Sequence, residues 1–385
     1  MKKLQVIVAI SILGFFLSSC RKEGCTDSNS PNYNPKAKID DGSCICSTNS
    51  GSTPYILDVP PALKIYLPEP IIPIDNPMTV EGVNLGKKLF FDKILSADLS
   101  QSCSSCHMPS NAFDDSNRFS IGINGIAGTR NAMPLFNLAW NNTGKFFWDG
   151  RAISLEEQAL APVTNPIEMN DTWVNVMSKL QSHSEYPSLF NKAFGTSIID
   201  SNMVAKALAQ YERTLMSGNS KMDKFLLRQV NLSASEARGL ALFRKDPTFD
   251  PISGAVLSGG GACDHCHGDP TNPLWTSFAF ENNGLDNTHV DIGLAETTGR
   301  SSDIGKFKSP SLRNLVFTAP YMHDGRFQTI DEVLNFYNDS IKSSATTSPN
   351  LKNSSSGGMH LNLQDLADLK AFLLTLTDST FVNSH

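Results

Sequence analysis

Two copies of a five-residue pattern, Cys-x-x-Cys-His, carry the residues best suited to do chemistry in this chain. The first copy runs from Cys103 to His107 and the second from Cys263 to His267. Two thiols about one helical turn apart can each form a thioether with a haem vinyl group, and the adjacent histidine can ligate the iron. Cys-x-x-Cys pairs also bind zinc, but a histidine directly after both pairs favours haem. The sequence therefore predicts two covalent c-type haems, bound by Cys103, Cys106, His107, Cys263, Cys266 and His267.

The segments around the two patterns repeat, which indicates how each is positioned. Gly-Lys-Lys-Leu-Phe at 86–90 precedes the first pattern, and Gly-Leu-Ala-Leu-Phe at 239–243 precedes the second. Both lie on helical patterns, and the second helix begins with a capping box at Ser233. An amphipathic helix follows near the C-terminus. A starting helix, a haem loop and a closing helix predict a mainly α protein of two cytochrome c-like domains, each holding one covalent haem.

Length and charge narrow the possible functions. The chain has 385 residues and a formal net charge of −6 at pH 7, so it has no basic footprint for nucleic acid. The part after the N-terminal region is long enough for two compact domains. We expect an N-terminal haem domain at 78–230 and a C-terminal haem domain at 231–385.

The first residues predict export, which c-type haem attachment requires. Lys2 and Lys3 precede an apolar stretch that is too short to be a comfortable transmembrane helix, which is typical of a signal peptide over 1–19. Residues 17–20 resemble a bacterial lipobox, which implies cleavage before Cys20 and lipid attachment to its sulfur. The chain would then be a periplasmic or cell-surface lipoprotein, anchored to a bacterial membrane. An ordinary signal peptide with a chance cysteine is the alternative.

Residues 20–77 are predicted to form a tether, because they carry many prolines and no helical period. Within them, the segment 24–46 is rich in Asp, Asn, Ser and Gly. It resembles a short Cys-bounded module found in some secreted bacterial proteins. In an oxidising compartment this implies a disulfide between Cys25 and Cys44, which leaves Cys46 unpaired.

Residues 78–380 resemble the bacterial dihaem cytochrome c peroxidase family. Besides the haem patterns, the matching stretches are FWDGR at 147–151, LEEQA at 155–159, PIEM at 166–169, SPSLRN at 309–314 and TAPYMHDG at 318–325. In that family the N-terminal haem reacts with hydrogen peroxide, and the C-terminal haem receives electrons. The resemblance therefore implies peroxide as the substrate and a small redox protein, a cytochrome c or a cupredoxin, as the electron donor.

The resemblance also assigns roles to single residues. It makes His107 the proximal ligand of the peroxidatic haem and His267 that of the electron-transfer haem. Trp148 matches the tryptophan between the haems, while Gln158 and Glu168 match distal-pocket residues. A distal carboxylate can move the proton that O–O cleavage needs, and an amide can orient the peroxide. Without the resemblance, these three would be a core tryptophan, a solvated helix glutamine and a surface-loop acid.

A calcium ion is implied in the same way. Asn131, Thr318 and Pro320 match positions that bind calcium between the two domains, partly through backbone carbonyls. Oxygen ligands of this kind suit calcium.

Two positions depart from the usual family pattern. Many members have a histidine sixteen residues after the proximal one, which blocks the peroxidatic iron until the other haem is reduced; here that residue is Ile123, which cannot ligate iron. The usual distal methionine of the other haem is replaced by Tyr337. A subgroup that resembles the dihaem enzyme of methylamine dehydrogenase maturation has this tyrosine, and tyrosinate is an established haem ligand. Met359 and Met322 remain rival ligands.

Three functions are compatible with these residues. The first is a peroxidase that reduces hydrogen peroxide, without reductive activation. The second is an oxidase of a protein or organic substrate, which the departures at Ile123 and Tyr337 favour. The third is a pure electron carrier, against which the pair Gln158 and Glu168 argues, because a carrier needs no open iron. The site and not the fold decides between them.

Overall fold

A computed structural model describes most of the chain. The described residues are 22–26, 33–41, 43, 52–253, 255–351 and 357–384. The predicted signal peptide over 1–19 and the predicted lipid-anchor residue Cys20 lie outside them. Within these ranges, no helix is both long and apolar enough to cross a bilayer.

The chain divides into two units, Met1–Asn49 and Ser50–His385. In the first unit, Cys25 is buried and takes part in a disulfide. Cys44 and Cys46 lie outside the described residues. The Cys25–Cys44 pairing therefore stays a prediction.

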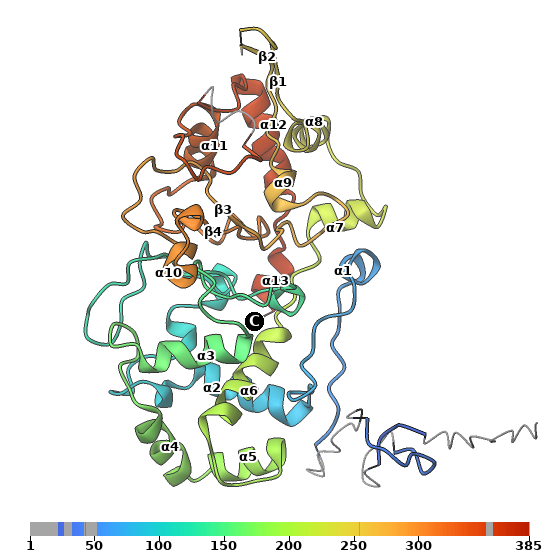
Figure 1. The fold of residues 1–385 in the computed structure, drawn as a ribbon, viewed down its shortest axis with the longest axis vertical. Helices are drawn as coiled ribbons and strands as arrows, with labels where there is room; N and C mark the ends of the chain where they lie inside the picture. Colours follow the sequence, from blue (N-terminus) through green and yellow to red (C-terminus); the bar gives the residue numbers. More distant parts are fainter. Residues whose placement is uncertain are drawn as a thin grey trace, which may run out of the picture. The chain divides into compact units, whose positions relative to one another are not determined.

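The second unit is rich in helices and poor in strands, which confirms the prediction of a mainly α protein (Figure 1). In the described residues the α-helices are α1 Pro61–Tyr66, α2 Val80–Phe91, α3 Leu155–Thr164, α4 Trp173–Ser182, α5 Tyr186–Phe194, α6 Ser201–Arg213, α7 Lys221–Leu226, α8 Ala234–Phe243, α9 Asp264–His267, α10 Leu294–Thr298, α11 Ile330–Asp339, α12 Leu363–Leu374 and α13 Ser379–Asn383. The strands form two antiparallel pairs: β1 Thr248–Phe249 with β2 Val256–Ser258, and β3 Phe280–Glu281 with β4 Phe307–Lys308.

The repeated glycine of the sequence is the point where two pairs of helices cross. Helix α2 packs on α6, and helix α8 packs on α12 (Figure 1). A Cβ on Gly86 of α2 would lie 1.9 Å from the Ala207 carbonyl oxygen of α6. A Cβ on Gly239 of α8 would lie at the same 1.9 Å from the Asp368 carbonyl oxygen of α12. Only glycine permits this close backbone approach, so the repeat specifies the same crossing twice.

The repeated phenylalanine packs the same way in both crossings. The ring centroids of Phe90 and Tyr211 lie 5.2 Å apart at an interplanar angle of 61°. Those of Phe243 and Phe372 lie 5.1 Å apart, also at 61°. Edge-to-face aromatic pairs of this kind contribute about 0.5–1.5 kcal/mol beyond the area that they bury. Each helix pair is therefore stabilised by its own aromatic contact. In both pairs the contact joins a phenylalanine that precedes a haem pattern to an aromatic residue that follows it.

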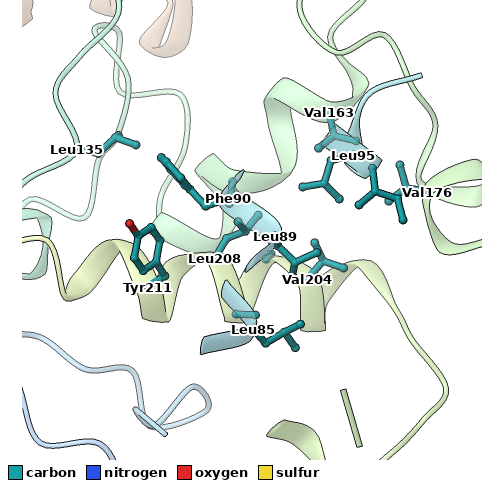
Figure 2. Close-up of a cluster of buried hydrophobic side chains, with 14 of the residues drawn as sticks. Leu85, Leu89, Phe90, Leu95, Leu135, Val163, Val176, Val204, Leu208 and Tyr211 are labelled. Atoms are coloured by element: carbon teal, nitrogen blue, oxygen red, sulfur yellow. The ribbon is translucent and has the colours of Figure 1, made fainter. Parts of the chain in front are cut away.

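A hydrophobic core surrounds the first crossing (Figure 2). Its side chains come mainly from α2, α6 and the neighbouring helices α3 and α4, with others from the segments between them. They include Leu85, Leu89, Phe90, Leu95, Leu135, Val163, Val176, Val204, Leu208 and Tyr211. A second core surrounds the other crossing and contains Phe243, Trp275, Leu369 and Phe372. Many of the helix N-termini are capped by side chains, and the predicted capping box at Ser233 is confirmed.

The segment 61–71 of the predicted tether is packed against the rest of the second unit. It contains the short helix α1, which starts with a proline at its first position. Leu63 of this helix is fully buried, and the Trp140 indole N–H donates to the Pro68 carbonyl oxygen at 2.8 Å. Ile71 N also donates to Ala139 O at 2.7 Å. These partners lie far along the chain, so local periodicity gave no sign of them.

Candidate active site

Both haem patterns form the same tight turn. Cys103 O accepts hydrogen bonds from Cys106 N at 3.2 Å and from His107 N at 2.9 Å. In the second turn, the carbonyl oxygen of Cys263 accepts from the amides of Cys266 and His267 at the same two distances. All four thiols are free and partly buried. Each turn thus presents two thiols and a histidine, the donor set that covalent haem attachment needs.

The backbone orients both histidine rings. The Nδ1 of His107 lies 3.1 Å from the Phe113 carbonyl oxygen, and that of His267 lies 3.0 Å from the Pro310 carbonyl oxygen. A carbonyl only accepts, so Nδ1 donates and Nε2 keeps its lone pair for a metal. Among the described residues, no group of three or more His, Cys, Asp or Glu is arranged to hold a metal ion directly. The donors fit haem.

A cavity of about 990 Å³ opens beside the first turn. This volume lies at the upper end of the range for small-molecule and cofactor sites. Its lining includes the first haem turn, the predicted distal residues and residues of the C-terminal half: Cys103, Cys106, His107, Trp148, Gln158, Glu168, Lys308, Pro310 and His323. The structure therefore brings together, in one cavity, predicted residues that are far apart in the sequence.

Glu168 is held at this cavity by the turn that follows α3. Asn165 Nδ2 donates to Glu168 Oε1 at 2.6 Å, and Glu168 N donates to Asn165 O at 3.0 Å. Burial raises the pKa of Glu168 above its ordinary value of 4.5, while the Asn165 hydrogen bond and the Arg151 charge oppose that rise. A partly buried carboxyl with a raised pKa in a cavity is suited to exchange protons.

Gln158 and Trp148 flank the same space. The Oε1 of Gln158 is buried and has no hydrogen-bond partner among the described residues, although it lies on a helix that lines the cavity. A buried, unpaired amide oxygen is costly and indicates a missing ligand. Trp148 is fixed at both ends, because its indole N–H donates to Asn131 O at 2.8 Å and its carbonyl accepts from Lys308 N at 3.0 Å.

Ile123 does not line the cavity, although Ser120 and Gly122 of the same loop do. Its amide donates to Glu168 O at 3.0 Å. A Cβ on Gly122 would lie 2.0 Å from Ile167 O, so this loop is packed closely on the turn that carries Glu168. The loop at 120–123 contacts the turn of Glu168 through main-chain atoms. The side chain of Ile123 has no group that could ligate a metal.

Tyr337 of α11 lies beside the second haem turn. Burial raises the pKa of its hydroxyl well above the ordinary value; the hydrogen bond from Asn283 opposes that rise, and the Cys266 and Cys263 thiols add to it. Asn283 Nδ2 donates to the Tyr337 hydroxyl at 3.1 Å and contacts Met322 Sδ at 3.5 Å. The Tyr337 hydroxyl and the Met322 thioether therefore share one amide.

Met359, the other rival ligand, is 2% exposed and lies in the C-terminal core. Its amide donates to Tyr337 O at 2.9 Å. Met359 is thus tied to the tyrosine through the main chain.

Of the residues predicted to bind calcium, Asn131 lines the cavity, whereas Thr318 and Pro320 do not. Asn131 Nδ2 donates to the carbonyl oxygens of Asn117 and Arg118, both at 3.2 Å. Asn131 N donates to His323 O at 2.7 Å, which places it against the loop that follows Thr318 and Pro320. The calcium site at Asn131, Thr318 and Pro320 therefore stays a prediction.

Sequence reasoning missed Asn165, Asn283 and Arg130 as site residues. Arg130 donates to Asp291 at 2.7 Å, to Glu296 at 2.8 Å and also to Asp149, so it ties the segment of Trp148 to the C-terminal half. Asn165 had a local signal, since Asn-Pro favours a turn directly before Glu168. The other two have partners far along the chain, which the sequence alone does not reveal.

Comparison with known proteins identifies the family of the chain. The di-haem cytochrome c peroxidase family profile matches residues 80–231. The methylamine utilization protein MauG of Methylophilus methylotrophus is 32% identical over 336 residues, which cover 84% of this chain and 91% of that protein. The cytochrome c551 peroxidase of Nitrosomonas europaea is 34% identical, with 69% of this chain and 76% of that protein covered.

Solved structures agree as well. The crystal structure of a MauG-like protein associated with microbial copper homeostasis has a TM-score of 0.73 and 32% identity, and the match covers 85% of this chain and 97% of that one. The diheme peroxidase BthA of Burkholderia thailandensis shares the fold, with a TM-score of 0.68 at 24% identity over 86% of this chain and 92% of that one. The chain therefore belongs to the di-haem cytochrome c peroxidase family and is an oxidoreductase of that type.

Proposed function

We propose that this protein reduces hydrogen peroxide to water with electrons from a small redox protein, and that it does so without reductive activation. The single observation that carries the proposal is the cavity that His107, Trp148, Gln158 and Glu168 line together. In this proposal residues 78–230 and 231–385 form two cytochrome c-like domains with one haem each. Because c-type haem is attached outside the cytoplasm, the proposal also requires export, in keeping with the predicted signal peptide and the lipid anchor at Cys20.

Each haem would have its own set of residues. Cys103 and Cys106 would form thioethers to the N-terminal haem, and His107 would be its only protein ligand. Cys263, Cys266, His267 and Tyr337 would hold the C-terminal haem. When bound, these haems supply the redox-active iron that the reduction of peroxide requires.

Glu168 would act as general base and then general acid. Its carboxylate would take a proton from one peroxide oxygen and deliver it to the other, so that the O–O bond breaks and the second oxygen leaves as water. Two electrons from the redox-protein donor and two protons from solvent would convert the remaining oxygen to a second water. The hydrogen bond from Asn165 keeps one carboxylate oxygen in place and leaves the other free to exchange a proton. Gln158 would accept a hydrogen bond from the peroxide through the Oε1 that has no partner among the described residues.

Trp148 would lie on the electron path. Its ring lines the cavity, and its carbonyl accepts from the strand that leads to Pro310, whose own carbonyl orients His267. A short run of chain therefore joins the tryptophan to the second haem turn.

A second candidate function is supported by Tyr337. An anionic phenolate ligand on the C-terminal haem would stabilise oxidised iron, which suits an enzyme that stores oxidising equivalents and then oxidises a protein or organic substrate. Steady-state turnover of peroxide with a reduced cytochrome c, compared with the spectrum after peroxide alone, separates the two functions. We expect sustained turnover with the donor. A long-lived oxidised spectrum without donor-dependent turnover would contradict the peroxidase proposal and favour the oxidase.

We expect two covalently bound haems per chain after export, because the two turns present equivalent donors. Extraction with acid and organic solvent should leave the haem on the protein, and a pyridine haemochrome spectrum should give a stoichiometry of about two. Extractable haem, or a stoichiometry of about one, would show that this prediction is wrong.

We also propose a calcium ion at Asn131, Thr318 and Pro320. Because the Asn131 carbonyl accepts the indole N–H of Trp148, removal of the ion should displace Trp148. Chelation should change the haem spectra and slow peroxide turnover, and calcium added back should restore both. Elemental analysis that finds no calcium, together with unchanged spectra after chelation, would rule the ion out.

A further inference from the structure

Lys308 is a cation that the proposed mechanism does not use. It ends β4, is 4% exposed and lines the cavity that also contains His107. A lysine ammonium is almost never fully buried unless it is paired, because burying an unpaired charge is costly. Its position therefore calls for a partner.

No carboxylate pairs with Lys308 among the described residues. Its Nζ donates to a neutral acceptor, the Lys145 carbonyl oxygen. The ammonium also lies 5.1 Å from the ring centroid of Phe146 and 5.2 Å from that of Phe278. An ammonium has three N–H donors, so two remain for a ligand. Burial without a nearby anion lowers the pKa of Lys308 to about 7, which agrees with a missing counter-ion.

The neighbouring lysine of the same segment shows the contrast. Lys306 donates to Asp303 Oδ1 at 3.1 Å and is partly exposed. It has a carboxylate from its own chain, whereas Lys308 has none among the described residues. The two lysines differ in burial and in partner, although only one residue separates them.

The position of Lys308 in the cavity suits it to bind a carboxylate of the N-terminal haem. The cavity is lined by Cys103, Cys106 and His107 of the first haem turn but by none of the three ligating residues of the second turn. A haem bound by covalent bonds at its vinyl edge has two propionate carboxylates at the opposite edge. Those carboxylates need partners when the macrocycle is buried.

We propose that the Lys308 ammonium binds a propionate carboxylate of the N-terminal haem and thereby raises the reduction potential of that haem. A positive charge near the macrocycle stabilises the reduced form, which carries one positive charge fewer. In this proposal Lys308 contacts the edge of the haem and does not contact the peroxide. The inference rests on the proposal that the cavity holds the N-terminal haem.

The test measures the reduction potential of each haem in the intact, haem-loaded protein. Lys308→Met keeps the approximate length of the side chain and removes its charge. We expect the equilibrium constant for reduction of the N-terminal haem to fall about tenfold, or about 59 mV for a one-electron couple. The propionate bending band in the resonance Raman spectrum should shift as well. Lys308→Arg keeps the positive charge, so the reduction potential of the N-terminal haem should stay close to the wild-type value. The control Lys306→Met should leave both the potential and the Raman band unchanged.

The outcomes separate the proposal from the proposed function. If haem is not covalently bound even in the wild type, the proposed function fails. If Lys308→Met loads both haems but shifts neither the N-terminal potential nor the Raman band, the Lys308 assignment is wrong. A shift confined to the C-terminal haem also overturns it, as does a wild-type potential that follows added phosphate, which would indicate a dissolved anion. Should Lys308→Met fail to fold, Lys308→Gln provides the same comparison with a polar side chain.

Discussion

Replacing Glu168 with glutamine should slow the reaction with hydrogen peroxide by about 10²-fold or more while both haems stay attached. The amide introduced in Glu168→Gln keeps the size of the side chain and can still bind a neighbouring amide, but it cannot take up a proton. Stopped-flow mixing of the variant with peroxide measures the rate, and the haem spectra before mixing show whether the site is intact. An unchanged rate would remove Glu168 from the mechanism.

The wild-type rate should also depend on pH in a defined direction. Glu168 must be a carboxylate to take the first proton, and burial raises its pKa above 4.5. The rate should therefore fall as the pH decreases through that raised pKa, and Glu168→Gln should lose this acid limb. Glu157→Gln is a matched control, because Glu157 is an exposed carboxylate at the start of α3. It should keep both the rate and the limb.

The second large effect concerns the ligands of the two haems. With Ile123 unable to ligate, the resting ferric protein should hold a five-coordinate or water-bound high-spin N-terminal haem. Tyr337 and His267 should make the other haem six-coordinate and low-spin, with a lower potential than a His/Met haem. Electron paramagnetic resonance should therefore show one high-spin and one low-spin signal. Peroxide should react with the fully ferric protein, without prior half-reduction.

Tyr337→Phe should abolish the His/Tyr low-spin signal. Tyr321→Phe is the control, because Tyr321 lies in the same half of the chain and its hydroxyl donates to Leu315 O at 2.7 Å. A low-spin signal that persists in Tyr337→Phe would make Met359 or Met322 the ligand. Two low-spin signals in the wild type, or no reaction until one electron is added, would contradict this prediction. Either result would show that the enzyme must be partly reduced before it reacts with peroxide.

The sequence predicted the features that depend on short segments. The turn from Cys103 to His107 and the capping box at Ser233 are set by residues within a few positions of each other, so pattern and spacing were sufficient. The resemblance to a family then grouped Trp148, Gln158 and Glu168, which the cavity brings together. Their roles are predictions that the variants above test.

Features that depend on distant partners could not be predicted. The sequence gives no sign that Lys308 is buried against Phe146 and Phe278, or that Arg130 reaches Asp291. The segment 61–71 of the predicted tether is packed for the same reason, since its partners lie far along the chain. Tertiary contacts determine which of these residues are buried and which partners they have, and local propensity does not predict such contacts.

The first glycine crossing joins two segments that are far apart in the chain. Helix α2 ends at Phe91 and its partner α6 begins at Ser201, so the first crossing closes a long loop that contains the first haem turn. Contacts of such long range form late, because loop closure must come first, and the N-terminal part of a chain is available earliest. We therefore expect the thiols of the first turn to stay accessible for haem attachment until α6 packs on α2. Gly86 permits that direct packing, so a larger residue at position 86 should hinder the last long-range contact of this half of the chain.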